Sequence, residues 1–238
     1  DVINADLNLR DTKTQSSIPA ITSIHLFEDN DNKIGIGLRM QPTALTYKGN
    51  TWNLSLDSLQ TAGGNIDISR LLLKGESQQL AANGTISTDS TMILELNFEH
   101  MDIYETMSLF SKNEPDLKGT ASGELQLAGI LGKTAFDGNL TIDSLEFGGS
   151  LFGDFDALLN WNQELSLINI KGTAKDSING AVTGVSGFFR PNDSYLDMTI
   201  NANHTDIGFL SKWTSSIFSD IGGRTTGRIR IFGPLSEL

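Results

Sequence analysis

The residues best suited to acid–base or metal chemistry are few in this chain of 238 residues. It has three histidines, His25, His100 and His204, and no cysteine. A metal site or a catalytic triad needs histidine beside aspartate or glutamate in space. His100 and His204 each precede an aspartate by two residues, but the arrangement occurs twice along the chain. A duplicated position of this kind favours capping or packing over catalysis.

Two other segments resemble ligand-binding motifs but lack residues or flanking elements that those motifs require. The acidic run 28–33 resembles the start of a calcium loop, but Lys33 would hold a ligand position and Met40 would hold the closing acidic position. We expect a hairpin there, joining His25–Phe27 to Ile34–Met40. The glycine-rich stretch Gly148–Gly153 lacks the strand–helix context of a dinucleotide loop and is interpreted as a turn. The sequence therefore predicts no enzyme, no metal and no cofactor.

Composition and charge limit the partners. The formal net charge is −12, with 17 basic residues that form no cluster. An acidic chain repels phosphate backbones, which argues against nucleic-acid binding. No apolar stretch approaches the ~18 residues of a transmembrane helix. The first residues have neither the basic start nor the apolar run of a secretory signal. We expect any membrane anchor or export signal to lie outside this sequence.

Alternation of apolar and polar residues is the commonest pattern in the chain. Period two is typical of strands with one apolar and one solvated face, and turn residues separate the runs. The sequence thus predicts an all-β, mostly antiparallel fold of many short strands. The apolar positions expected to point inward include Leu94, Leu96, Phe98, Leu125, Leu127, Leu140, Ile142, Met198, Ile200, Ile229 and Ile231.

Two segments depart from this alternation and have helical spacing. Residues 102–112 place Ile103, Met107 and Phe110 on one stripe, with Asp102 as N-cap and Glu105 three residues later. Residues 206–218 form a similar stripe. We expect two short amphipathic helices, which need tertiary packing because short helices are marginal alone.

The two helical segments belong to an internal repeat with an offset of 104 residues. Residues 119–131 match residues 223–235, and His100 and Asp102 match His204 and Asp206. The copies cover about 80–143 and 184–238. We interpret residues 1–238 as one continuous repeated β-rich segment of a longer array, because the second copy stops in mid-pattern. The alternative is a duplication inside one closed domain.

The block 119–131, followed by Phe136-Asp-Gly-Asn-Leu-Thr-Ile142 and then by residues 165–172 and 182–207, resembles the TamB and AsmA-like family. In that family a glycine-ended strand precedes an "F-x-G-x-L-x-I" strand, and "L-x-G" follows later. The match is good from about residue 119 onward and loose over the first ~75 residues. Its motifs are glycines and alternating aliphatic residues, which carry little information.

The resemblance implies a sheet curled into an elongated open groove. It implies a segment of a periplasmic bridge protein whose apolar lining carries phospholipid acyl chains between the inner and outer membranes. The full-length protein would then be anchored in the inner membrane of a Gram-negative-type envelope. The alternative function is a scaffold for assembling outer-membrane proteins with a barrel partner similar to TamA. The inward positions named above would line the groove, or else form an ordinary closed core.

Overall fold

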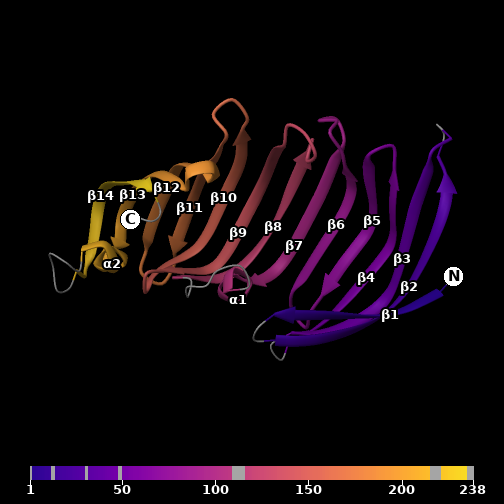
Figure 1. The fold of residues 1–238 in the computed structure, drawn as a ribbon. Helices are drawn as coiled ribbons and strands as arrows, with labels where there is room; N and C mark the ends of the chain where they lie inside the picture. The colour runs from indigo at the N-terminus through magenta and orange to yellow at the C-terminus, as the bar shows by residue number, and fades with distance from the viewer. Residues whose placement is uncertain are drawn as a thin grey trace. The chain divides into compact units, whose positions relative to one another are not determined.

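The computed structural model describes residues 2–11, 14–29, 32–47, 50–108, 116–214 and 221–234. Its strands form one sheet whose order follows the chain from β1 to β14, and the registered pairs of neighbouring strands are antiparallel (Figure 1). The all-β, antiparallel prediction is confirmed, whereas the elongated groove stays a prediction. The strands are β1 (Val2–Asp11), β2 (Thr14–Glu28), β3 (Ile34–Tyr47), β4 (Asn50–Ala62), β5 (Asn65–Lys74), β6 (Gln79–Ile86), β7 (Ile93–Asp102), β8 (Leu117–Ala128), β9 (Ala135–Phe147), β10 (Ser150–Asn162), β11 (Leu167–Asp176), β12 (Ala181–Arg190), β13 (Tyr195–Asp206) and β14 (Arg224–Pro234).

Helical structure is shorter than the sequence predicts. The first helical segment begins as expected with α1 (Ile103–Ser108), and the Asp102 carboxylate accepts a hydrogen bond from the Glu105 N–H at 2.7 Å. The second is a 3-10 turn, η2 (Gly208–Leu210), followed by the four-residue α2 (Ser211–Thr214). The expected second amphipathic α-helix is therefore wrong over 206–210, and α-helical structure in this segment is limited to the four residues of α2. Residues 109–112 and 215–218 of the two predicted helices lie outside the described residues.

The 3-10 turn has a local cause at Asp206. Its carboxylate accepts a hydrogen bond from the Gly208 N–H, two residues on, at 2.7 Å. This bond from residue i+2 forms an Asx turn, which competes with the capping bond to residue i+3 that begins an α-helix. A second short 3-10 turn, η1 (Pro191–Asp193), connects β12 to β13.

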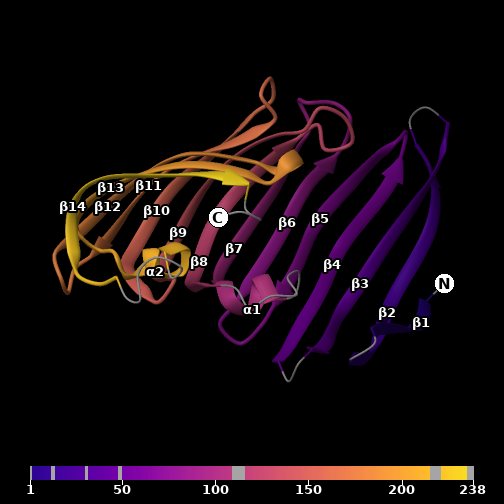
Figure 2. The same cartoon turned by 60° about the vertical axis from the view of Figure 1, so that its left-hand side comes forward.

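Two compact units divide the chain. The first contains residues 1–99 and 125–135, and the second contains residues 100–124 and 136–238. Strands β1 to β6 lie wholly in the first unit and β10 to β14 wholly in the second. The residues of β7, β8 and β9, which Figure 2 labels between these two sets, are shared between the units.

The same type of β-bulge recurs in the sheet. At three places two residues oppose one residue of the next strand: Ser69–Arg70 face Asn83, Asp143–Ser144 face Asp154, and Asn203–His204 face Thr226. The second bulged residue has φ near +50°, and its N–H donates to a side-chain oxygen of the single residue opposite. Bulges of this kind bend the strand and increase its twist.

His100 carries the same arrangement as His204. Their φ angles are +51° and +56°, and their N–H groups donate to the Ser122 and Thr226 hydroxyls at 3.0 and 3.2 Å. Both donor and acceptor are related by the offset of 104 residues. The two histidines thus occupy equivalent strained backbone positions, and this explains why the His-x-Asp pattern occurs twice.

Candidate functional site

The second unit has one sheet face that is apolar in continuous rows across β9 to β14. Residues paired across neighbouring strands point to the same face, so the strand register fixes the composition of each row. One row crosses all six strands without a polar residue: Leu140, Ala157, Gly172, Val185, Ile200 and Ile229.

Rows on either side of it have the same character. One consists of Gly138, Leu159, Ile170, Gly187, Met198 and Ile231, and the other of Ile142, Phe155, Ala174, Thr183, Ala202 and Gly227. Thr183 is the polar exception, and its hydroxyl is paired with that of Thr205 at 2.7 Å. We call these three rows the apolar face of the second unit.

The opposite face of the same strands is solvated and carries most of their charged residues, although Leu158, Val182 and Phe232 are exposed apolar residues on it. Asp197 receives two hydrogen bonds from the Arg230 guanidinium, at 2.9 and 2.7 Å, and these lower the pKa of its carboxyl group. Asn201 accepts a hydrogen bond from Arg228 at 3.1 Å. Each strand therefore separates an apolar side from a solvated one, as its alternation predicts.

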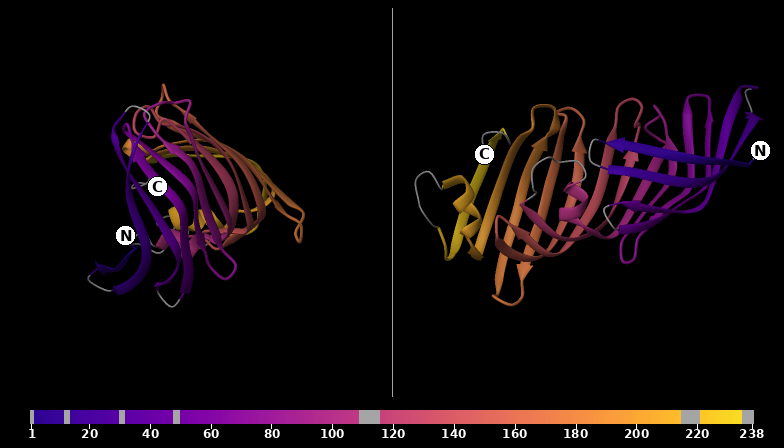
Figure 3. Two further views of the ribbon diagram at one scale, coloured as in Figure 1. Left: turned by 90° about the vertical axis from the view of Figure 1, so that its right-hand side faces the viewer. Right: turned by 60° about the horizontal axis from the view of Figure 1, so that its bottom comes forward.

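A small aromatic cluster lies in this unit between η2 and the turn that joins β9 to β10. Phe209, on η2, is 1% exposed, and its ring lies 5.3 Å from that of Phe152 and 6.2 Å from that of Phe147. The Ser150 hydroxyl donates to the Asp206 carboxylate at 3.4 Å, joining the start of β10 to the end of β13. These contacts bring η2 against the β9–β10 turn (Figure 3).

The first unit carries an apolar face of its own on β3 to β7. One row is Met40, Leu56, Leu71, Ala82 and Leu96. The row on one side is Leu38, Leu59, Ile68, Gly84 and Leu94, and the row on the other is Thr43, Leu54, Leu73, Leu80 and Phe98. In both units, the alternation of apolar and polar residues thus places the apolar residues on one face of the sheet.

The predicted lining residues all occupy buried or half-buried positions. Leu94, Ile142 and Met198 are 6%, 5% and 8% exposed. The half-buried members are Leu96, Phe98, Leu125, Leu127, Leu140, Ile200, Ile229 and Ile231. Leu94, Leu96 and Phe98 lie on the first unit's apolar face, and Leu140, Ile142, Met198, Ile200, Ile229 and Ile231 on that of the second. The structure thus divides these nine residues between two faces, and the other two, Leu125 and Leu127, lie on β8.

Sequence reasoning missed the lining residues of β10 to β12. The bulge at Gly153 shifts the alternation within β10, so Phe152 and Phe155 are both buried although they are three residues apart. On β11 and β12 the inward positions are often small, such as Gly172 and Ala174. Hydrophobic periodicity detects large apolar residues and overlooks small ones. The spacing of Gly172 and Ala174, two residues apart on β11, is the sequence feature that could have placed them on one face.

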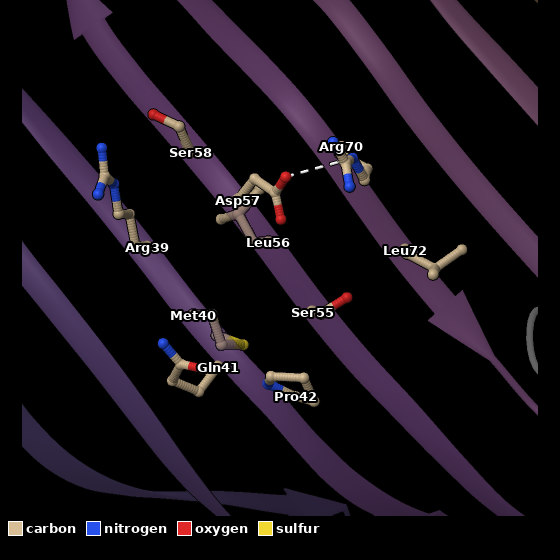
Figure 4. Close-up of a pocket in the computed structure, with 10 residues that line it drawn as sticks. All are labelled: Arg39, Met40, Gln41, Pro42, Ser55, Leu56, Asp57, Ser58, Arg70 and Leu72. Carbon is tan, nitrogen blue, oxygen red and sulfur yellow. Dashed lines mark ion pairs between the residues drawn. The ribbon is translucent and has the colours of Figure 1, made fainter.

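A depression of mixed polarity lies on the first unit between β3, β4 and β5. Its volume is about 600 Å³, and its ten lining residues include the polar Arg39, Asp57, Ser58 and Arg70 as well as Met40 and Leu56 of the apolar row (Figure 4). Arg70 forms an ion pair with Asp57 at 3.2 Å, and both side chains are more than half exposed. The Ser58 hydroxyl oxygen is buried and has no hydrogen-bond partner. An exposed ion pair of this kind contributes little to stability.

A metal-binding cluster is absent from the part of the chain that the structure describes. Among those residues, no group of three or more His, Asp or Glu side chains could hold a metal ion. The acidic segment near residue 30 is a hairpin end, where β2 pairs with β3 and the Asp29 carboxylate accepts the Lys33 N–H at 2.8 Å. The hairpin prediction is confirmed.

Comparison with known proteins identifies no relative. No family model, no curated protein and no solved structure matches this chain. Within its described residues, the helices are too short or too polar to cross a membrane.

Proposed function

We propose that the apolar sheet faces bind the acyl chains of lipids, and that the protein is a non-enzymatic lipid carrier. The observation that carries this proposal is the unbroken row from Leu140 to Ile229 in the second unit. A sheet with one apolar face has to bury that face against another layer or a ligand. The described helical elements of this unit contain only three to six residues each, too few to cover six strands.

The size of the face suits an acyl chain. Six strands spaced ~4.8 Å apart span about 24 Å, and the five residues that the three rows cover on each strand span about 14 Å. The product is on the order of 300 Å², within the range of the largest apolar patch of a soluble monomer. Half the ~30 Å thickness of a bilayer core is about 15 Å, so one extended chain fits across the strands.

Bending of the sheet within the second unit favours a trough-shaped binding surface and not a flat one. β10 contacts β12 and β13, although one and two strands lie between them in the sheet. Strands three places apart in a flat sheet would be separated by about 14 Å. The bulges at Ser144 and His204 provide a local cause for such bending.

The biological setting follows from the family resemblance alone. We propose a periplasmic bridge that passes phospholipid between the inner and outer membranes of a Gram-negative-type envelope, with a membrane anchor outside residues 1–238. Transport would be passive, because acyl chains can slide along the lining while headgroups stay in water. The alternative, a scaffold for outer-membrane protein assembly with a TamA-like barrel partner, also remains a proposal.

Native mass spectrometry of the chain purified from bacterial cells tests lipid binding. Ile200→Asp places a carboxylate between Val185 and Ile229 and should release co-purified lipid. Thr199→Asp is the matched control, because Thr199 lies on the polar face opposite Arg230. Far-UV circular dichroism and urea midpoints establish that both variants are folded. Absence of lipid from the wild-type protein, or equal lipid retention by both variants, would contradict the proposal.

Leu127→Asp with Gln126→Asp as its control extends the test to the first unit. Leu127 is half-buried and Gln126 is exposed. Loss of lipid in Leu127→Asp alone would indicate that this part of β8 also lines the binding surface. Full retention in both variants would remove Leu127 from the proposed lining.

A further inference from the structure

We propose that a lipid held on the second unit lies in one orientation, with its polar end beside Trp161 and the methyl ends of its acyl chains toward Phe209. This inference rests on the proposed function, because it concerns the lipid that the apolar face would bind. The two ends of that face differ in exposure, in aromatic content and in the polar groups just beyond them.

The end of the apolar face nearest η2 is already buried within the chain. Five members of its row are at most 8% exposed, namely Ile142, Phe155, Ala174, Thr183 and Ala202. Toward the β9–β10 turn lie Phe152, 8% exposed, and Phe209, 1% exposed, whose rings are 5.3 Å apart. A headgroup placed here would lose its water, and burial of an unpaired polar group is costly. This end therefore suits the methyl end of an acyl chain.

The other end of the face carries a fourth apolar row, which is rich in aromatic side chains. Strand register across β10 to β14 aligns Trp161, Ile168, Phe189, Leu196 and Gly233. Phe136 on β9 extends the row, since its ring lies 5.8 Å from that of Trp161. All six residues are half-buried. Three aromatic residues thus gather in one row, whereas the other three rows together contain a single aromatic residue, Phe155.

Trp161 suits the boundary between an acyl chain and water. Its ring is apolar and carries one polar N–H group, and tryptophan is enriched at the level where lipid headgroups meet hydrocarbon. Polar groups follow directly along the strands. The Asn162 side-chain oxygen accepts the Leu165 N–H at 3.0 Å in an exposed turn. On β12, Arg190 forms an ion pair with Asp193 at 2.7 Å, and both side chains are more than a third exposed. A headgroup at this end can therefore keep water and hydrogen-bonding partners.

The fourth row also makes the face long enough for this orientation. The four rows cover seven residues along each strand, for example 155–161 on β10, and seven residues span about 20 Å. Half of a bilayer core is about 15 Å thick. An extended acyl chain that starts beside Trp161 can thus run along the strands and end near the buried row.

Fluorescence of Trp161 tests the orientation in the full chain. Trp52→Phe and Trp213→Phe leave Trp161 as the only tryptophan. The protein is incubated with vesicles of phosphatidylcholine that carries bromine, a contact quencher of tryptophan, either near the ester or near the methyl end of one acyl chain. The protein is then separated from the vesicles, and native mass spectrometry measures the bound lipid. We expect ester-proximal bromine to remove most of the Trp161 emission and methyl-proximal bromine to leave most of it.

A control moves the only tryptophan to the opposite face at the same end of the strands. Phe232→Trp with Trp161→Phe does this in the same background, because Phe232 is 57% exposed and lies on the solvated face. Neither probe should quench this variant, and quenching as strong as that of Trp161 would overturn the proposal. Equal quenching of Trp161 by both probes, stronger quenching by methyl-proximal bromine, or no quenching although lipid is bound would overturn the orientation and leave lipid binding intact. If the isolated protein holds no lipid, the proposed function fails together with the orientation.

Two lysine substitutions on β12 test the same polarity without fluorescence. Phe189 and Val185 are half-buried and lie four residues apart on one face. A cation costs little near a membrane interface and much more at hydrocarbon depth, and a lysine stem can carry its ammonium group to water. We expect Val185→Lys to lower the amount of bound phosphatidylcholine about tenfold or more, and Phe189→Lys to lower it less than about threefold. Circular dichroism and urea midpoints establish that both variants are folded. Equal losses, or a greater loss in Phe189→Lys, would overturn the proposal.

Discussion

The left-handed residue of the repeated bulge predicts an unusual stability effect at His204. Its φ of +56° is costly for any residue other than glycine, because Cβ approaches the backbone. Relief of about 1–2 kcal/mol of strain in His204→Gly is opposed by about 0.5–1 kcal/mol of extra backbone entropy in the unfolded chain. We expect His204→Gly to stabilise the protein by about 0.5–1 kcal/mol, in contrast to most strand substitutions by glycine.

Two further variants make the prediction specific. Asn203→Gly changes the neighbouring residue, which has no positive φ, and should destabilise by about 0.5–1 kcal/mol. Thr226→Ala removes the acceptor of the His204 N–H and should cost about 0.5–1.5 kcal/mol. His100→Gly and Ser122→Ala, the equivalents in the first copy, should act in the same directions.

Urea denaturation at pH 7, combined with hydrogen exchange of β13 and β14 amides, measures these effects. Exchange is needed because two units can unfold separately, and a single transition then has no defined free energy. If His204→Gly and Asn203→Gly change stability in the same direction by similar amounts, the reasoning from the left-handed backbone is wrong.

Three other perturbations follow from the second unit. Phe209→Ala should destabilise it by about 3 kcal/mol, the lower end for buried Phe→Ala changes, whereas the exposed Phe232→Ala should have little effect in the same urea assay. Hydrogen bonds, chiefly from the Asn179 side-chain amide, lower the pKa of Asp176 below its ordinary value of 3.8, so this carboxylate stabilises the fold above about pH 4 and the contribution is lost as pH falls through the lowered pKa. Asp176→Asn should therefore be less stable than wild type at pH 7, with a gap that narrows in melts below pH 4; a constant gap would disprove the linkage. Gly153→Ala places a Cβ against the Lys175 carbonyl oxygen at a residue with φ +84°, and should lower the free energy of unfolding by about 1–3 kcal/mol. Gly222→Ala adds a Cβ in open space, and the same melts should show no measurable change in stability.

The sequence predicts the strands well because alternation is a local signal. Leu94, Leu96 and Phe98 were correctly separated from Glu95 and Asn97, since period two directly gives the face of each side chain. The signal fails at bulges, where one extra residue reverses the faces: Phe152 and Phe155 share a side only because of the bulge around Gly153. The predicted α-helix does not begin at Asp206, because the Asp206 carboxylate accepts a hydrogen bond from the N–H two residues on and a 3-10 turn follows.

The offset of 104 residues between the histidines was visible in the sequence, but its meaning was not. A left-handed backbone at a non-glycine residue has no compositional mark, and the acceptors Ser122 and Thr226 lie 22 residues away. Pairing of side chains across strands depends on register, and register depends on the bulges. The apolar residues of β11 and β12 were missed for a related reason, because glycine and alanine contribute face area without a hydrophobic signal.

The strictly sequential strand order has a consequence for how the protein forms. Each strand of the sheet lies beside its neighbours in the chain, so most pairings close only a short loop, with longer connections after β7 and β13. Short loops carry a small entropy cost, and a low contact order favours fast folding. Strands can thus be added one hairpin at a time in the order of synthesis. Inserting or deleting a whole hairpin leaves the pairing of the other strands intact, so evolution can adjust the length of such a sheet without redesigning its core.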